Sequence, residues 1–175
     1  VYHDPESKAL NRNGLKKHLR EEINRLGRKN AWLSLVVLDF SQRDWMEVSQ
    51  GAESISRLKK ILLRFLGGSL RNYDLLGQLE TERICIISGD CDYKCLTGLL
   101  NRLQLAVKSF VVGSQFRGAE ISLCGLAGSF IIDSTFGDSE KCFEHLWNWI
   151  ESIEQLPEGI ESSSACLDKN GISPL

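Results

Sequence analysis

Residues 71–88 read RNYDLLGQLETERICIIS, and this stretch decides the fold. Two short apolar runs, Tyr73 to Leu79 and Arg83 to Ser88, flank the polar segment Glu80-Thr81-Glu82. Apolar runs of strand length on both sides of a short polar segment are typical of a β-hairpin, although this segment lacks the Gly and Asn of most tight turns. We therefore expect two antiparallel strands here.

The sequence on both sides of the hairpin alternates between helical and strand-like patterns. Apolar residues recur at helical spacing in 15–26, 55–66, 93–107 and 143–156, and strand-like apolar runs occupy 33–40 and 119–132. This alternation predicts an α/β sandwich on a mixed sheet. We assign residues 1–158 to one domain and expect 159–175, which contain three consecutive serines, to be a C-terminal tail that is partly ordered at best.

The composition is that of an ordinary domain. The chain has 175 residues, of which 42% are hydrophobic, and a net charge of -2. Such a balance offers no field to hold a nucleic-acid backbone, so we exclude polymeric nucleic acid as a partner. No apolar run of about 18 residues and no signal peptide occur, so we expect a cytoplasmic domain without membrane insertion. Because the chain opens on Val1, we also expect a fragment of a larger multidomain protein, one form of which is the cytosolic part of a membrane-anchored protein.

Six cysteines, at 85, 91, 95, 124, 142 and 166, lie mostly in apolar stretches. This pattern predicts buried free thiols in a reducing compartment. Cys91 and Cys95 are spaced to share a metal ion, but the three His residues are scattered and no second ligand pair stands nearby. We therefore expect no zinc site and no cofactor.

Several short motifs occur in a fixed order and spacing without a gap. They are Asp4-Pro5-Glu6-Ser7 with Asn11-Arg12 behind it, the strand-like run Leu35 to Asp39, Gly51, and Ser122 to Ala127. With these motifs the chain resembles, over residues 4–156, the GGDEF-domain family, the diguanylate cyclases that join two GTP into cyclic di-GMP. The resemblance implies a palm-like fold with a central mixed, mostly antiparallel five-stranded sheet flanked by helices.

The signature turn of the family is degenerate in this chain. Glu80, Thr81, Glu82, Arg83 and Ile84 stand where the family has Gly-Gly-Asp-Glu-Phe. Side chains and a negative charge at the two glycine positions occupy space that a triphosphate would need. The resemblance therefore implies a domain that does not make cyclic di-GMP and is not an enzyme.

The other parts of the family's catalytic site are kept unevenly. Asp39 stands at the first metal-ligand position, and Glu82 supplies a second carboxylate, so these two are vestigial metal candidates. Glu47 and Ser56 replace the Asn and Asp that would bind guanine. The two acids are therefore either solvated side chains or the remains of an Mg-nucleotide site, and we expect no bound metal.

By contrast, Arg71 and Asp74 fall where the family has its product-binding inhibitory site, an Arg-x-x-Asp motif, and Arg102 falls on the supporting Arg. A guanidinium donates well to guanine O6 and N7, and a carboxylate accepts from N1 and N2. The alternative is an ordinary i, i+3 ion pair on the surface.

Three functions remain open at this point. The first is a cyclic di-GMP receptor that uses Arg71, Asp74 and Arg102 and passes the signal to attached domains or partners, with a ligand-linked homodimer as one output. The second is a GTP/Mg-binding domain that regulates a neighbouring phosphodiesterase. The third is a nucleotide-free interaction scaffold, with Trp45, Trp149 and the charged helix 12–28 as contact surfaces.

Overall fold

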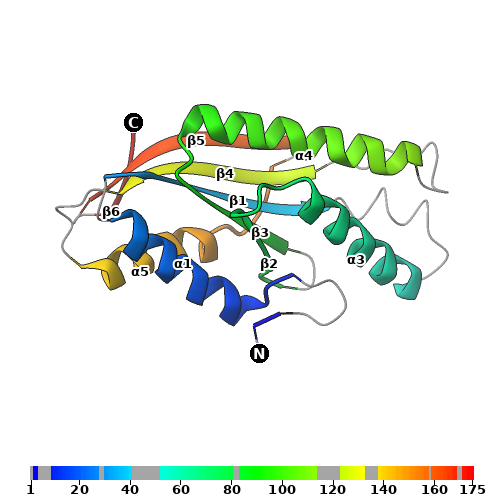
Figure 1. Cartoon of the computed structure of the whole chain (residues 1–175), viewed down its shortest axis with the longest axis horizontal. Coiled ribbons are helices and arrows are strands. Elements are labelled where there is room, and N and C mark those ends of the chain that lie inside the picture. The colour runs from blue at the N-terminus through cyan, green and yellow to red at the C-terminus, as the bar shows by residue number, and fades with distance from the viewer. Residues whose placement is uncertain are drawn as a thin grey trace.

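The computed structural model describes residues 2–3, 9–27, 30–40, 52–80, 83–113, 123–132, 138–157, 159–168 and 171–175. Helices and strands alternate along these residues (Figure 1). Their order is α1 (Arg12–Leu26), β1 (Trp32–Phe40), α3 (Ala52–Gly68), β2 (Leu75–Gln78), β3 (Arg83–Gly89), α4 (Tyr93–Gly113), β4 (Leu123–Ile132), α5 (Ser139–Glu151), β5 (Gly159–Asp168) and β6 (Gly171–Pro174).

One mixed sheet holds the six strands in the order β2-β3-β1-β4-β5-β6. The pair β4 and β5 is parallel and the other neighbours are antiparallel. The hairpin predicted from residues 71–88 is present, since β2 pairs antiparallel with β3 from Leu75 opposite Ile87 to Gln78 opposite Ile84. The predicted fold class is confirmed, with six strands instead of five.

Helices cover both faces of the sheet. Helices α1 and α5 pack on one face, and α3 and α4 pack on the other (Figure 1). Because successive side chains of a strand point to opposite faces, Leu35 and Val37 of β1 contact the α1–α5 layer, while Val36 and Leu38 contact the α3–α4 layer. A strand covered on both faces reads as a continuous apolar run, which is the pattern that predicted β1.

The predicted helices are present with shifted ends. Helix α1 begins at Arg12, because the side chain of Asn11 accepts a hydrogen bond from the backbone N–H of Gly14 at 2.9 Å and caps the first turn. Two residues of the α3 stripe, Ile61 and Phe65, are 48% and 40% exposed, so this helix buries a narrower face than its sequence predicted. Among the described helices, none is long and apolar enough to cross a membrane.

The C-terminal segment 159–175 corrects the expectation of a tail that is partly ordered at best. Its first half, β5, runs parallel to β4 over nine residue pairs from Gly159 to Leu167, and β6 folds back on it. Ala165 and Leu167 enter the core on the α1–α5 side. Three consecutive serines suggested disorder, but backbone pairing along the edge of β4 does not depend on apolar side chains.

The cysteines also differ from the expectation of six free thiols. Cys91 and Cys95 form a disulfide across the first turn of α4. Cys85 and Cys142 are buried free thiols, as predicted, and burial raises the pKa of each to about 12. The spacing of four residues between Cys91 and Cys95 was therefore the signal for a bridge.

Candidate functional site

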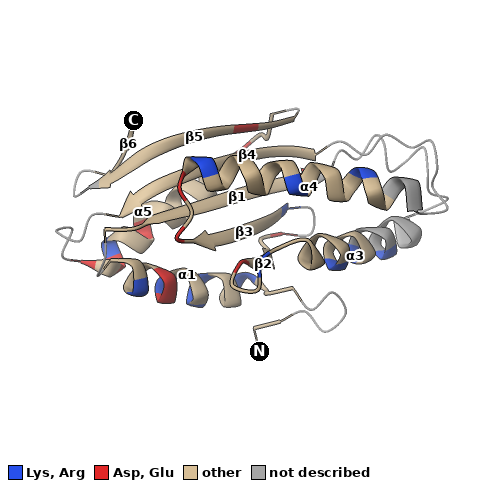
Figure 2. Ribbon diagram, turned by 45° about the horizontal axis from the view of Figure 1, so that its top comes forward, with Lys and Arg blue, Asp and Glu red and all other residues tan. Residues whose placement is uncertain are grey.

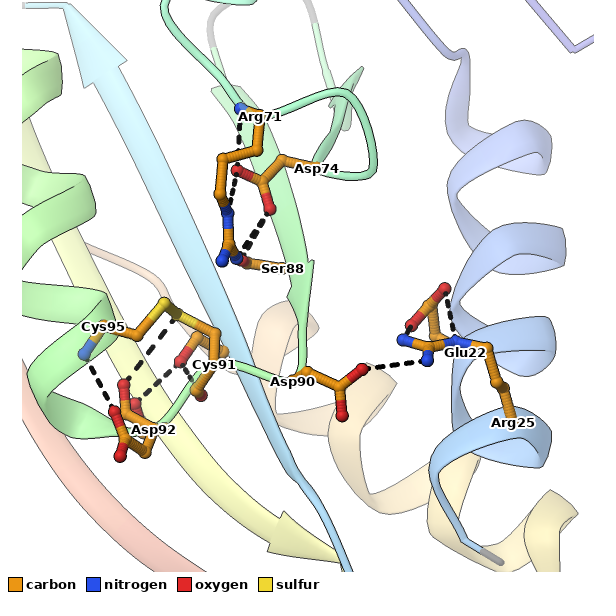
Figure 3. Close-up of polar contacts among 11 residues, drawn as sticks. Glu22, Arg25, Arg71, Asp74, Ser88, Asp90, Cys91, Asp92 and Cys95 are labelled. Carbon is orange, nitrogen blue, oxygen red and sulfur yellow. Dashed lines mark hydrogen bonds and ion pairs between the residues drawn. A yellow bond between two sulfur atoms is a disulfide. The ribbon is translucent and has the colours of Figure 1, made fainter. Parts of the chain in front are cut away.

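The Arg-x-x-Asp motif forms a tight turn between α3 and β2. The backbone N–H of Asp74 donates to the carbonyl of Arg71 at 3.0 Å, and the N–H of Arg71 donates to Asp74 Oδ2 at 3.1 Å. Asn72 and Tyr73 form the exposed tip of the turn. Figure 3 shows the two side chains of the motif lying together above Ser88 of β3. The sequence motif is thus a single local structure.

The side chains of Arg71, Asp74 and Ser88 form a closed cluster (Figure 3). Arg71 Nε donates to Asp74 Oδ2 at 3.2 Å and Nη2 donates to Oδ1 at 3.1 Å, which is a bidentate pair. The Ser88 hydroxyl accepts from Arg71 Nη2 at 2.6 Å and donates to Asp74 Oδ1 at 2.7 Å. The hydrogen bond to the carboxylate raises the pKa of Arg71, so its positive charge is secure.

Exposure differs sharply between the two members of the pair. The side chain of Asp74 is 0% exposed and that of Arg71 is 24% exposed. Both carboxylate oxygens already accept hydrogen bonds, so in this arrangement a ligand reaches Arg71 and not Asp74. Arg71 and Asp74 do form an i, i+3 ion pair, as the alternative interpretation of the motif predicted. The pair does not lie on the surface, however, because the carboxylate of Asp74 is buried.

A row of buried serines continues the cluster across the sheet. Ser34 of β1 stands opposite Ser88 of β3 on one side and Ser129 of β4 on the other, and all three are 0% exposed. The Ser34 hydroxyl donates to the carbonyl of Cys91 at 2.7 Å and shares a 2.7 Å hydrogen bond with Ser129. Sequence analysis missed this row, although each serine interrupts an apolar strand and so signalled a buried polar contact.

Arg102 lies on α4, on the same side of the sheet as Ser88. Its side chain is exposed beside the buried Leu99 and Leu103, as the helical pattern predicted. In the described part of the chain no hydrogen bond or ion pair joins Arg102 to Arg71 or Asp74. The structure therefore brings together two of the three predicted ligand-binding residues.

The residues on both sides of the hairpin turn, Leu79 and Glu80 before it and Arg83 after it, are joined by backbone hydrogen bonds. The backbone N–H of Leu79 donates to the carbonyl of Arg83 at 2.9 Å. The backbone N–H of the exposed Glu80 donates to the same carbonyl at 3.4 Å. The Arg83 guanidinium donates to the backbone carbonyls of Ile153 and Glu154, beyond the end of α5. Arg83 thus connects the hairpin to the α5 side, a structural role that the sequence did not reveal.

The remaining residues that the sequence comparison with the family singled out are described in part. Asp39 stands directly opposite Arg83 across β1 and β3, and Ile84 is buried in the core. Ser56 lies in α3. The predictions for Trp45, Glu47, Thr81 and Glu82 fall on residues outside those that the structure describes. Within the described ranges, no group of three His, Cys, Asp or Glu side chains is placed to hold a metal ion.

A cavity of about 410 Å³ lies beside the motif. It opens to solvent between the C-terminal half of α3, residues 70 and 74–76, and the segment around Leu10. Leucines dominate its wall, which also includes His3, Arg64 and Asp74, although the side chain of Asp74 is 0% exposed. No sequence pattern predicted this cavity, because its wall joins segments far apart along the chain.

The comparisons with known proteins agree with this architecture. The sequence matches no family model and no curated protein. The fold, however, is that of GGDEF domains, which solved structures share over nearly the whole chain.

Three such structures illustrate the likeness. The diguanylate cyclase SiaD from Pseudomonas aeruginosa, in complex with its activator SiaC, is 20% identical with a TM-score of 0.69, over 93% of this chain and 62% of SiaD. The GGDEF domain of DgcB from Caulobacter crescentus in complex with c-di-GMP is 11% identical with a TM-score of 0.69, over 93% of this chain and 95% of that one. A microbial GGDEF domain described with bis-cyclic di-GMP is 18% identical with a TM-score of 0.63, over 92% and 98%. This chain thus spans 62% of the SiaD chain, and at these identities the likeness is one of fold.

Proposed function

We propose that this chain is a cyclic di-GMP receptor without cyclase activity. The observation that carries the proposal is the Arg71–Asp74 pair, which presents a fixed and partly exposed guanidinium on a GGDEF fold. Two of the solved structures with this fold concern cyclic di-GMP. The chemistry of the ligand matches, because a guanidinium donates to guanine O6 and N7 and attracts phosphate.

Each residue of the site has a distinct part in this proposal. Arg71 contacts the guanine base, and Asp74 acts on the ligand through Arg71 by fixing its plane and its charge. Arg102, exposed on α4, supplies a second guanidinium for the phosphates. A direct contact of Asp74 with the base needs the pair to open first.

Lack of cyclase activity is supported by the turn at residues 79–83. Glu80 places an exposed acid at the first signature position, where a triphosphate would be repelled. Arg83 is engaged with the carbonyls of Ile153 and Glu154. No turnover of GTP is therefore expected, and the bound cyclic dinucleotide acts as a signal that is passed to attached domains or partners.

Calorimetric titration tests the proposal. We expect cyclic di-GMP to bind the wild-type chain with a Kd in the micromolar range or tighter, about -8 kcal/mol, and Arg71→Ala and Asp74→Ala to lose that binding. Arg102→Ala should weaken it, whereas Lys108→Ala, an exposed cation on the same helix, should leave it unchanged. If Lys108→Ala weakened binding as much as Arg102→Ala did, the contribution of Arg102 would be nonspecific charge attraction.

The second titration, GTP with Mg²⁺, addresses the alternative of a GTP-dependent regulator of a phosphodiesterase. GTP binding that Asp39→Ala abolishes and Arg71→Ala spares would replace our proposal. If neither nucleotide binds, that result favours the alternative of an interaction scaffold. If cyclic di-GMP does bind, sedimentation of the chain with and without this ligand decides whether binding is coupled to formation of a homodimer.

A further inference from the structure

The tip of the Arg-x-x-Asp turn carries an aromatic side chain that no part of the motif accounts for. Tyr73 is 57% exposed, and its ring lies against the guanidinium of Arg71, with Arg71 Cζ 4.3 Å from the ring centroid. Large aromatic side chains bury 150–250 Å² when they find a partner. An aromatic ring with this exposure is therefore available for contact.

The turn fixes Tyr73 before any ligand arrives. Two backbone-based hydrogen bonds close it, from Asp74 N–H to the Arg71 carbonyl and from Arg71 N–H to Asp74 Oδ2. The guanidinium against which the ring lies is held by Asp74 and Ser88. A surface that is already ordered loses little conformational entropy on binding.

The hydrogen bonds that Arg71 already makes limit which atoms of a base its guanidinium can contact. Nε and Nη2 already donate to Asp74 and Ser88, and the Tyr73 side chain also interacts with the guanidinium and contributes to its raised pKa, so Nη1 is the nitrogen that Asp74 and Ser88 do not engage. A bidentate fork to guanine is therefore incomplete while the pair stays closed. Stacking of a flat base on an aromatic–guanidinium surface needs no free donor.

We propose that Tyr73 is a ligand-binding residue on which a guanine base stacks, with Arg71 Nη1 donating to the same nucleotide. The inference rests on the proposed function and adds a contact that the Arg-x-x-Asp motif does not include. Stacking is tolerant of base identity, so Tyr73 supplies affinity and the arginine supplies the preference for guanine. The competing role for Tyr73 is to cover the ion pair.

Calorimetric titration with cyclic di-GMP, on a matched set of variants, separates these roles. Tyr73→Ala should weaken the Kd about tenfold or more, and Tyr73→Leu, which keeps an apolar cover, should weaken it similarly. Tyr73→Phe should stay within about twofold of wild type because it keeps the ring. Tyr93→Ala, which removes a tyrosine that is 42% exposed on α4, is the control and should bind as wild type does.

A spectroscopic reading tests stacking itself. A cyclic dinucleotide with 2-aminopurine in place of one guanine loses fluorescence when that base stacks, and Tyr73→Leu should reduce this quenching at saturating protein. Thermal unfolding of each variant checks that the turn still folds.

Each contrary result overturns a different statement. If Tyr73→Ala and Tyr73→Leu bind within about twofold of wild type while Arg71→Ala loses binding, Tyr73 only covers the pair and the receptor proposal survives. If Tyr73→Phe loses as much as Tyr73→Ala, the hydroxyl and not the ring makes the contact. If the wild-type chain does not bind, both the stacking role and the proposed function are wrong.

Discussion

Arg71 and Arg83 lie at opposite ends of the same hairpin, and the chain uses them differently. Arg71 precedes β2 and is held by the side chains of Asp74 and Ser88. Arg83 begins β3 and donates to the backbone carbonyls of Ile153 and Glu154. Figure 2 shows Lys and Arg interspersed with Asp and Glu along the described ribbon.

The difference between these arginines lies in what holds them. Side chains can rotate, so the Arg71 cluster can exchange a hydrogen bond for a ligand contact while the turn stays in place. Main-chain carbonyls are fixed by the fold, so the acceptors of Arg83 move only with the local backbone. Our proposal thus assigns ligand binding to the arginine at one end of the hairpin and a structural role to the arginine at the other.

Asp74→Ala gives the largest expected effect. It leaves the Arg71 guanidinium partly buried without its carboxylate and removes the acceptor that closes the turn, which should lower the free energy of unfolding by about 3 kcal/mol. Urea denaturation with a two-state fit measures the change.

Ser88→Ala provides the graded comparison for that variant. It removes one hydroxyl from the same cluster and should cost only about 1 kcal/mol. Equal losses for both variants would mean that the strand, and not the ion pair, carries the stability of this end of the hairpin.

Arg83→Ala tests the opposite end. It deprives two main-chain carbonyls of their donor, and we expect a loss of about 1–2 kcal/mol in the free energy of unfolding. Cyclic di-GMP affinity, measured by calorimetry, should stay at the wild-type value, because Arg83 contacts the α5 side and not the Arg71 cluster. A large drop in affinity would break the division of roles between the two arginines.

Strand β3, which runs from one end of the hairpin to the other, contains the buried thiol of Cys85, and the titration of this thiol provides a test. Burial raises the pKa of Cys85 to about 12. The unfolded chain releases the same proton above about pH 9, so it binds fewer protons than the folded chain and stability falls as pH rises from about 9 to 12. At about pH 10 the loss is about 1.4 kcal/mol, and guanidinium groups stay charged there.

Urea midpoints of wild type and Cys85→Val between pH 8 and pH 10.5 provide the measurement. The variant should lose part of the alkaline slope, because valine fills a similar volume and has no proton to release. An unchanged slope would assign the alkaline loss to other groups, including Cys142, whose pKa burial also raises to about 12.

The periodic parts of the fold were predictable and the polar edge strand was not. The apolar stripe of α1 and the continuous apolar run of β1 identified their elements, because burial on a fixed face leaves a period in the sequence. Strand β5 carries Ser162, Ser163 and Ser164 and gains its place from backbone pairing with β4. Backbone pairing leaves no such period, so the segment read as a tail.

For the candidate site, the sequence located the motif but not its internal contacts. The spacing of Arg71 and Asp74 was enough to predict that they act together. The burial of Asp74 depends on Ser88, which lies 14 positions further along and meets it only through the hairpin register. Arg83 donates to the carbonyl of Ile153, which lies 70 positions further along the chain. No local sequence pattern encodes this contact.

Both outer strands of the sheet are protected against pairing with another molecule. The segment at Leu10 lies along β2, donating to the carbonyl of Leu76 at 3.0 Å and accepting from the N–H of Gln78 at 2.8 Å. At the opposite edge, β6 has four residues and ends at Pro174, which has no N–H to offer. Strand addition along β2 and β6 is thereby discouraged, whereas β6 pairs only with Ala165 to Asp168 of β5 and does not extend along the first residues of that strand.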